Sequence, residues 1–211
     1  MKKENTEIYK EIENRIVKLK YEPGELIKEK ELINEFNVSR TPIREALLKL
    51  SEKGLVKMIP RVGTYVSQID IKNIKYAYET KKYLEMLASE LASLRATNEE
   101  IEKIVKISER IDTYDTIKNY KDYIEDDHLF RKTIREASKN PMLIEYLEEL
   151  NVITGRFIRY IHYKIKDPKW YNRSLKKIAY AIKNRDSELA RKETEKHLAI
   201  FLEEVSKKFF M

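Results

Sequence analysis

The sequence contains no cysteine, and it has only four glycines and five prolines among 211 residues. Without cysteine, the chain can form neither a disulfide framework nor a zinc site built on thiolates. Glycine and proline are the residues that most often interrupt regular structure, so their scarcity leaves little room for loops. With 42% hydrophobic and 37% charged residues, the composition predicts a mostly helical chain that can build one large or two small cores.

Long apolar runs are also absent, since none approaches the roughly 20 residues that a membrane-spanning helix requires. The first residues, MKKENTEIYKEIENRI, lack the apolar centre of a signal peptide. We therefore expect a protein with no membrane partner that stays in the cytoplasm. The sequence also shows no nucleophile and base at matched spacing and no glycine-rich phosphate loop, so we do not expect an enzyme.

Positive charge is in excess, and it is concentrated in one segment. The formal net charge of the chain is +7 at pH 7. Residues 39–61 contain six Lys or Arg and two Glu, which gives this segment alone a charge of +4. Such a concentration is the electrostatic footprint expected of a surface that binds a nucleic acid.

Residues 38–50, VSRTPIREALLKL, have the pattern of a short helix with one buried face. Ser39 stands at the N-cap position, and Pro42 is tolerated in the first turn because the N–H that it lacks has no helical partner there. Apolar residues recur at i, i+3, i+4 and i+7, and they are Ile43, Ala46, Leu47 and Leu50. The opposite side carries Arg40, Thr41 and Arg44, which are therefore available to a partner.

A second short amphipathic helix precedes it in KEKELINEFN, and Asn37 can close that helix in the left-handed conformation. The pair is either a helix-turn-helix or an ordinary helical hairpin. The following residues favour the first reading, because Gly54 ends the helix, LVKMI and TYV are β-prone, and PRVG between them forms a turn. A β-hairpin after the second helix makes a winged helix, with Arg61 at the tip of the wing.

Residues 8–67 resemble the amino-terminal DNA-binding domain of the GntR family of bacterial and archaeal transcription regulators. The matching pieces are Pro23-Gly24 with Leu26, VSRTPIREAL at 38–47, GLV at 54–56, and Arg61, Gly63 and Val66. The resemblance implies that seven residues face DNA, namely Lys30, Ser39, Arg40, Thr41, Arg44, Arg61 and Gly63.

Arg40 is the residue that we expect to read a base, because a guanidinium offers two parallel donors to O6 and N7 of guanine. Side chains such as Lys30, Ser39 and Thr41 mainly position the phosphate backbone, and the Arg61–Gly63 tip is expected in the adjacent minor groove. For Arg44 we predict a phosphate contact. The alternative for Arg44 is an ion pair with a nearby acidic residue.

From residue 71 onward the pattern changes to nearly unbroken helix, so we expect two domains, residues 1–69 and 70–211. The expected helices of the second domain span residues 71–96, 98–112, 116–138, 141–165, 169–184 and 187–209. TNEE at 97–100 has the pattern of a capping box. The predicted fold class is therefore mainly α, with an N-terminal winged helix-turn-helix and a C-terminal all-α helical bundle.

A bundle behind such a head resembles the FadR subfamily and its helical FCD effector domain, in which a small ligand, commonly an organic acid or fatty-acid derivative, controls DNA affinity. The matching residues are Asp127, Phe130, Ile134, Ala137, Ser138, Asn140, Pro141, Ala181, Ile182, Asp186, Ala190, His197 and Leu198. Many members of that subfamily hold a divalent metal with one Asp and three His. Asp127 and His197 match two of these ligands, but Arg131 and Leu175 stand where the other two histidines are expected.

We predict no bound metal, because a guanidinium has no lone pair to give to a cation. Arg131 would instead offer parallel donors to a carboxylate, so we expect Asp127, Arg131 and His197 to bind an anionic effector. The alternative is that Asp127 and Arg131, four residues apart on one helix, pair with each other. Both arrangements can hold at once.

Together these features predict a homodimeric, ligand-responsive regulator, a repressor that binds a palindromic operator in double-stranded DNA and is associated with the nucleoid. Two heads about one DNA turn apart can read an inverted repeat, so the helical domains would supply both the dimer interface and the spacing. The alternative is a winged-helix architectural or RNA-binding protein whose bundle serves only dimerisation. The two differ in sequence preference, which is strong for a regulator and weak for an architectural protein.

Overall fold

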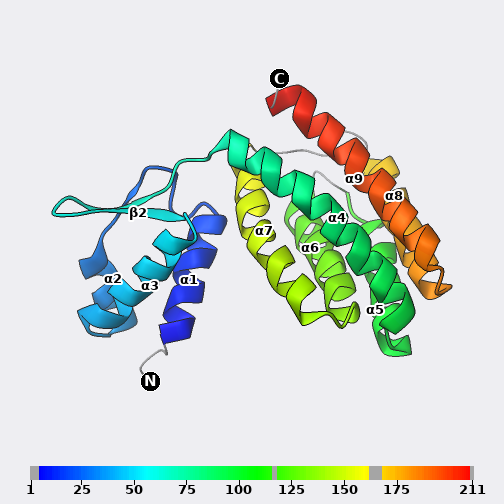
Figure 1. Ribbon diagram of the computed structural model, residues 1–211, viewed down its shortest axis with the longest axis horizontal. Helices are drawn as coiled ribbons and strands as arrows, with labels where there is room; N and C mark the ends of the chain where they lie inside the picture. Colours follow the sequence, from blue (N-terminus) through cyan, green and yellow to red (C-terminus); the bar gives the residue numbers. More distant parts are fainter. Residues whose placement is uncertain (1–4, 116–117, 162–167, 210–211) are drawn as a thin grey trace. The chain divides into compact units, whose positions relative to one another are not determined.

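The computed structural model describes residues 5–115, 118–161 and 168–209 (Figure 1). It divides into two compact units, Met1–Asp70 with Val152–Tyr163, and Ile71–Asn151 with Lys164–Met211. The first unit thus takes in the C-terminal part of helix α7 (Pro141–Tyr160) in addition to the residues expected for the first domain. Each unit has its own hydrophobic core.

The first unit is built on three helices, α1 (Asn5–Val17), α2 (Glu29–Phe36) and α3 (Arg40–Glu52). The apolar residues expected on the inner face of α3 are all buried, at 2% exposure or less, and they are Ile43, Ala46, Leu47 and Leu50. They pack with buried residues of the other two helices, such as Ile12 and Leu32. The predicted apolar spacing is therefore confirmed, and it leaves the polar side of α3 facing outward.

A small antiparallel sheet completes the winged helix, with strands β1 (Leu26–Ile27), β2 (Val56–Ile59) and β3 (Gly63–Val66) in the order β1-β3-β2. Val56 lies opposite Val66 and Ile59 opposite Gly63, which confirms the predicted hairpin. Strand β1 was not expected from the sequence, because a segment of two residues has no periodicity to recognise. It pairs Leu26 with Tyr65 and fixes the chain before α2 to the base of the wing.

The ends of α3 hold it in place between the turn and the wing. Ser39 occupies the N-cap position with extended backbone, as predicted, although its side chain makes no capping hydrogen bond. At the other end Gly54 has φ +70°, the left-handed conformation that favours glycine. The Leu55 N–H donates to the Leu50 carbonyl and the Gly54 N–H to the Ser51 carbonyl, each at 2.9 Å. These two bonds form a Schellman motif, which turns the chain sharply into β2.

The second unit is all-helical within the described residues and contains α4 (Ile71–Arg95), α5 (Asn98–Ile111), α6 (Tyr120–Ala137), the first part of α7, α8 (Pro168–Lys183) and α9 (Ser187–Phe209). The long helix α4 packs against α6, α8 and α9 (Figure 1). The predicted capping box is confirmed, since the Glu100 N–H donates to Thr97 Oγ1 at 3.3 Å and the Thr97 N–H to Glu100 Oε2 at 2.9 Å. Both the fold class and the order of the helices agree with the sequence prediction.

Two of the expected helix ends, residues 116–117 and 162–165, lie outside the described residues. The other boundaries differ from the expected ones by a few residues at most, as frayed helix ends usually do. Across the described ranges, no helix combines the length and apolar character needed to cross a membrane.

Candidate functional site

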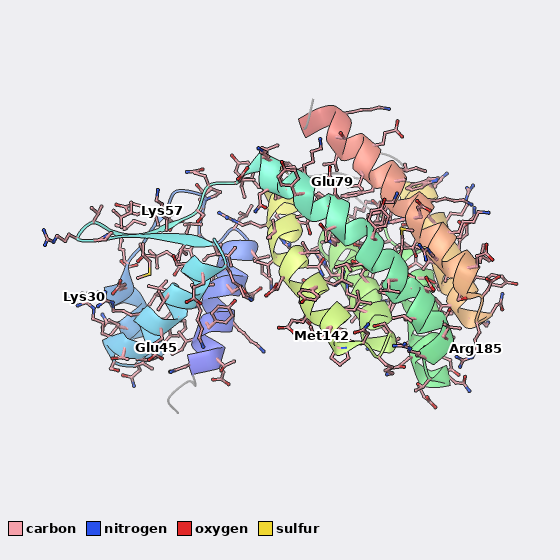
Figure 2. All side chains as sticks on the ribbon, in the orientation of Figure 1. Lys30, Glu45, Lys57, Glu79, Met142 and Arg185 are labelled. Atoms are coloured by element: carbon pink, nitrogen blue, oxygen red, sulfur yellow. The ribbon has the colours of Figure 1, made fainter. Side chains whose placement is uncertain are left out.

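The outer surface of α3 carries the side chains that the sequence assigned to DNA. Ser39, Arg40, Thr41 and Arg44 are all exposed, as is Lys30 on the neighbouring helix α2. Figure 2 marks Lys30 on α2 and also Lys57 on β2, a further exposed lysine of the same unit. The structure therefore places the predicted contact residues on the solvent-exposed side of α2 and α3.

Among the described residues of this surface, Arg40 forms an ion pair and Arg44 does not. The alternative foreseen for Arg44, an ion pair with a nearby acid, does not occur among the described residues. Arg40 instead has Nε 3.4 Å from Glu29 Oε2, in a pair whose arginine side chain is 70% exposed. An exposed pair of this kind contributes about 0–1 kcal/mol, so Arg40 can leave Glu29 for a stronger partner.

The wing tip has an unusual backbone. The Val62 N–H donates to the Ile59 carbonyl at 3.1 Å, which closes a turn in which Pro60 is followed by Arg61 at φ +63°. Proline followed by a residue of positive φ is typical of a type II turn, but glycine or asparagine normally fills the second position. An arginine here costs backbone energy, and strain of this kind is concentrated at functional sites. The side chain of Arg61 is exposed at the tip.

Gly63 begins the returning strand at φ +149°, a conformation that side chains rarely adopt. A Cβ at this position would lie 2.8 Å from Cδ1 of Leu26. Only glycine therefore lets β1 and β3 approach each other at the base of the wing. Its role is to shape the wing, and it presents no side chain to DNA.

Three of the seven predicted residues line one surface groove of about 450 Å³ between the sheet and the start of the two DNA-facing helices. Lys30 and Arg40 supply its positive charge, and Gly63 forms part of its wall. Glu29 is its acidic member. The other four predicted residues do not line this groove, but all are exposed at the start of α3 or at the wing tip, namely Ser39, Thr41, Arg44 and Arg61.

The second unit brings together the three residues that the sequence assigned to an effector. Arg131 Nε donates to Asp127 Oδ2 at 3.2 Å, and Arg131 Nη2 lies 2.7 Å from Nε2 of His197. Nη2 also donates to the hydroxyl of Tyr171 at 2.9 Å, and that hydroxyl donates to Asp127 Oδ1 at 2.8 Å. The pairing of Asp127 with Arg131, foreseen as the alternative, is thus present. It belongs to a network that joins α6, α8 and α9.

The protonation of His197 follows from its neighbours. Because a guanidinium can only donate, Nε2 of His197 must accept, and the ring hydrogen is then on Nδ1. Nδ1 lies 2.5 Å from Ser174 Oγ, and that hydroxyl donates to the Tyr171 carbonyl at 2.6 Å. Burial, followed by the charge of Arg131, lowers the pKa of His197 to about 3. His197 is therefore a neutral acceptor at physiological pH.

The donor set does not fit the metal that the family resemblance implies. The guanidinium of Arg131 fills the space between Asp127 and His197 and bonds to both. Leu175, at the place expected for a third ligand, is fully buried in the hydrophobic core. Across the described ranges, no three His, Cys, Asp or Glu side chains are grouped as a metal would require. A cation at this place would meet a fixed positive charge.

A second layer of charged groups lies next to this network. It was not predicted from the sequence. Arg135 on α6 donates to Glu85 Oε1 on α4 from Nη2 at 2.7 Å and from Nε at 3.2 Å. The side chains of this pair are only 9% and 4% exposed. Lys81 lies one turn before Glu85 on α4, within range of its charge. The signal in the sequence was the spacing of four between Lys81 and Glu85, and again between Asp127, Arg131 and Arg135.

These features define a class of protein: a winged helix whose exposed recognition helix and wing are basic, joined in one chain to a helical domain with a buried polar centre. Residues 4–66 match the family model "Bacterial regulatory proteins, gntR family", and residues 76–199 match that of the FCD domain. The chain belongs to the GntR family, and it is a transcription regulator with an FCD effector-binding domain.

Known proteins of this family match most of the chain. The HTH-type transcriptional repressor RspR of Escherichia coli is 26% identical over 202 residues, covering 95% of this chain and 88% of RspR. The uncharacterised HTH-type transcriptional regulator YdhC of Bacillus subtilis is 31% identical over 163 residues, covering 74% of this chain and 70% of YdhC. The solved structure of Escherichia coli McbR/YncC superposes with a TM-score of 0.80 at 20% identity, covering 97% of this chain and 98% of McbR, which supports the fold.

Proposed function

We propose that this regulator binds a palindromic operator as a homodimer and represses transcription until a small carboxylate-bearing effector occupies its helical domain. The observation that carries the proposal is the outer face of α3, where Arg40, Thr41 and Arg44 project beside an arginine-tipped wing. In this proposal Arg40 reads a guanine, and Arg61 enters the minor groove. Lys30, Ser39, Thr41 and Arg44 contact the phosphate backbone. Repression is supported by the name of RspR, a repressor.

Selection of bound fragments from the source genome tests this function. We expect fragments that share an inverted repeat, bound about a thousandfold or more tightly than bulk DNA at the same salt concentration. An architectural protein would show a steep dependence on salt and almost no preference among sequences. Recovery of unrelated fragments, or tighter capture of RNA than of duplex DNA, would contradict the proposal.

The proposed homodimer is supported by an apolar surface on the second unit. Along α4, Tyr83, Leu87 and Leu94 recur at helical spacing and are 63%, 37% and 57% exposed. Helix α7 packs against α4 through buried Leu143 and Leu147. It exposes Met142 and Tyr146 at 57% and 51%, and Figure 2 marks Met142 on α7.

Large side chains exposed in a row normally indicate an interaction surface, because single exposed apolar residues are scattered on most proteins. A winged helix has one recognition helix and reads one half-site, so an inverted repeat requires a second head. A two-fold pairing through the same apolar surface of both copies would supply that head. We therefore assign the surface formed by Tyr83, Leu87, Leu94, Met142 and Tyr146 to the homodimer.

The double substitution Tyr83→Glu with Leu87→Glu is expected to give a monomer, because two copies would each bury two carboxylates in an apolar interface. Sedimentation equilibrium should give the wild-type protein twice the mass of the 25.3 kDa chain and the variant the mass of one chain. Tyr180→Glu on α8 is the matched control, since Tyr180 is 62% exposed away from this surface. A monomeric wild-type protein, or a variant that stays dimeric, would refute the assignment.

We also propose that no divalent metal binds at Asp127 and His197. Titration of zinc or nickel into chelator-treated protein should show no tight one-to-one binding, because Arg131 occupies the space between the two donors. Calorimetry measures this directly, and Arg131→His is the informative companion because it replaces the cation with a third potential ligand. Tight binding to the wild-type protein that disappears in His197→Ala would overturn the claim.

A further inference from the structure

Lys81 faces the effector network from a helix that the metal pattern does not include. Two rows of charges lie against each other, Lys81 and Glu85 on α4 and Asp127, Arg131 and Arg135 on α6. In each row the residues are four positions apart, so they project from successive turns of one helix face. Helices α4 and α6 pack together, which brings the two rows within Coulombic range.

The two ends of the cluster differ in their exposure to solvent. The side chains of Glu85 and Arg135 are 4% and 9% exposed, whereas those of Asp127 and Arg131 keep 13% and 15%. Lys81 is partly exposed in the same way. The end of the cluster formed by Lys81, Asp127 and Arg131 is thus partly exposed to solvent, whereas the end formed by Glu85 and Arg135 is buried.

Arg131 keeps one edge of its guanidinium for such a ligand. Its Nε is used by Asp127, and its Nη2 by Tyr171 and His197. Within the described part of the chain, Nη1 of Arg131 donates no hydrogen bond to a protein acceptor. It is also not one of the buried side-chain atoms that lack a partner, so it keeps some contact with solvent. Two N–H groups of a permanent cation are thus open to an acceptor, and a carboxylate oxygen is the acceptor that a guanidinium binds best.

Charges in this cluster also favour an anion. The charged residues that act on Lys81 include two carboxylates, Glu85 and Asp127, and two further cations, Arg131 and Arg135. Its ammonium group also lies 5.9 Å from the centre of the Tyr78 ring. In this cluster Lys81, Arg131 and Arg135 outnumber the carboxylates Glu85 and Asp127, so an anion is attracted to it. His197 and Tyr171, which face the same network from α9 and α8, are neutral at physiological pH.

We infer that Lys81 is a direct contact of the carboxylate effector, which binds between the ammonium group of Lys81 and the open edge of Arg131. The inference rests on the proposed function, because it assumes that a small anion enters this domain. It adds a residue from α4 to a site otherwise built on α6, α8 and α9. It also makes effector binding depend on the protonation of Lys81.

The coupling follows from the electrostatics of Lys81. Burial, opposed by Glu85 and reinforced by Arg135 and Arg131, lowers the pKa of Lys81 to about 7. A bound carboxylate would raise that pKa, so binding takes up a proton and is favoured at low pH. Effector affinity is then expected to fall about tenfold between pH 6 and pH 8. His197 is neutral across this range. His128, on the exposed side of α6, also acts on Asp127, so the pH dependence that Lys81 supplies is the part that is lost when Lys81 is replaced.

The test uses calorimetry and thermal shift with acetate, succinate and citrate as probes, at pH 6 and pH 8. For a probe that binds the wild-type protein, Lys81→Met should weaken binding at pH 6 by about tenfold, the usual loss of one charge-assisted hydrogen bond. Lys81→Arg keeps the charge but cannot lose its proton, so it should bind with little difference between the two pH values. Lys75→Met, an exposed lysine of the same helix, is the matched control and should bind as the wild type does.

The outcomes separate the two claims. If a probe binds the wild-type protein and Lys81→Met binds it equally well, or if Lys81→Arg keeps the full pH dependence, Lys81 is not a contact and the proposed regulator remains. If none of the probes binds the wild-type protein, the carboxylate effector itself is wrong, and the role of Lys81 falls with it. Circular dichroism at both pH values shows whether each variant is folded.

Discussion

Arg40→Ala is expected to weaken binding to the selected operator by about ten- to a hundredfold and to reduce discrimination at one base pair. The expectation follows from the value of a bidentate arginine–guanine contact, about 1–3 kcal/mol. The free protein loses little, because Arg40 is 70% exposed and its pair with Glu29 is a surface contact. Fluorescence anisotropy with the operator, and with operators altered at single positions, measures both effects.

Arg44→Ala should act differently, because a phosphate contact carries no sequence information. We expect weaker binding to all duplexes in about equal proportion, and a salt slope smaller by about one. Lys10→Ala, which removes an exposed positive charge from α1 in the same unit, is the matched control and should bind almost normally. Unchanged discrimination in Arg40→Ala would exclude this arginine as the base reader, and unchanged binding in Arg40→Ala with Arg44→Ala would exclude α3 as the recognition helix.

Glu85→Ala is expected to lower the free energy of unfolding by about 3–5 kcal/mol, the usual cost of leaving one member of a buried ion pair alone. Glu85 accepts two hydrogen bonds from Arg135, and both side chains are less than a tenth exposed. The same change removes the carboxylate that acts most strongly on Lys81. Urea unfolding followed by circular dichroism gives the difference.

Two further variants make this result specific. Glu85→Leu combined with Arg135→Met removes both charges and should come much closer to wild-type stability than Glu85→Ala does. Glu90→Ala breaks the more exposed pair with Arg191 and should cost at most about 1 kcal/mol. Equal stability of Glu85→Ala and Glu90→Ala would show that the buried pair contributes nothing special.

The pH dependence of the Glu85 contribution has a definite sign. Burial alone raises the pKa of Glu85, but Arg135 and Lys81 together hold it below its usual value. A carboxyl group with a lowered pKa in the folded state stabilises the protein above its ordinary titration range, and this contribution is lost as the pH falls through the folded value. The difference between wild type and Glu85→Ala should therefore persist at neutral pH and shrink in acid.

Much of the first unit could be predicted from sequence because its signals are local. The apolar spacing from Ile43 to Leu50, the left-handed Asn37 and Gly54, and the hairpin around Pro60 each involve neighbours in the chain, and each is confirmed. Strand β1 could not be predicted, because Leu26 and Ile27 are a strand only through their pairing with β3. The exposure of Arg40, Thr41 and Arg44 follows from the same helical periodicity.

The polar centre of the second unit depends on contacts between distant segments, so only part of it could be predicted. The resemblance placed Asp127, Arg131 and His197 in one site, and the structure brings them together. Tyr171 and Ser174 complete the network, but nothing in the sequence of α8 shows that the Tyr171 hydroxyl joins Asp127 and Arg131 of α6, or that Ser174 meets His197 of α9. Lys81 belongs to a helix whose polar residues look like an ordinary solvated face until α6 is packed against it.

The hydrogen bonds of Arg131 have a consequence for the working conditions of the domain. A metal that ties helices together can be removed by chelation, by starvation or by competition with other ions. The guanidinium of Arg131 is part of the chain and cannot dissociate from it. Its hydrogen bonds therefore link α6, α8 and α9 as soon as the chain has folded. Regulation by this protein would then remain the same in cells rich or poor in zinc.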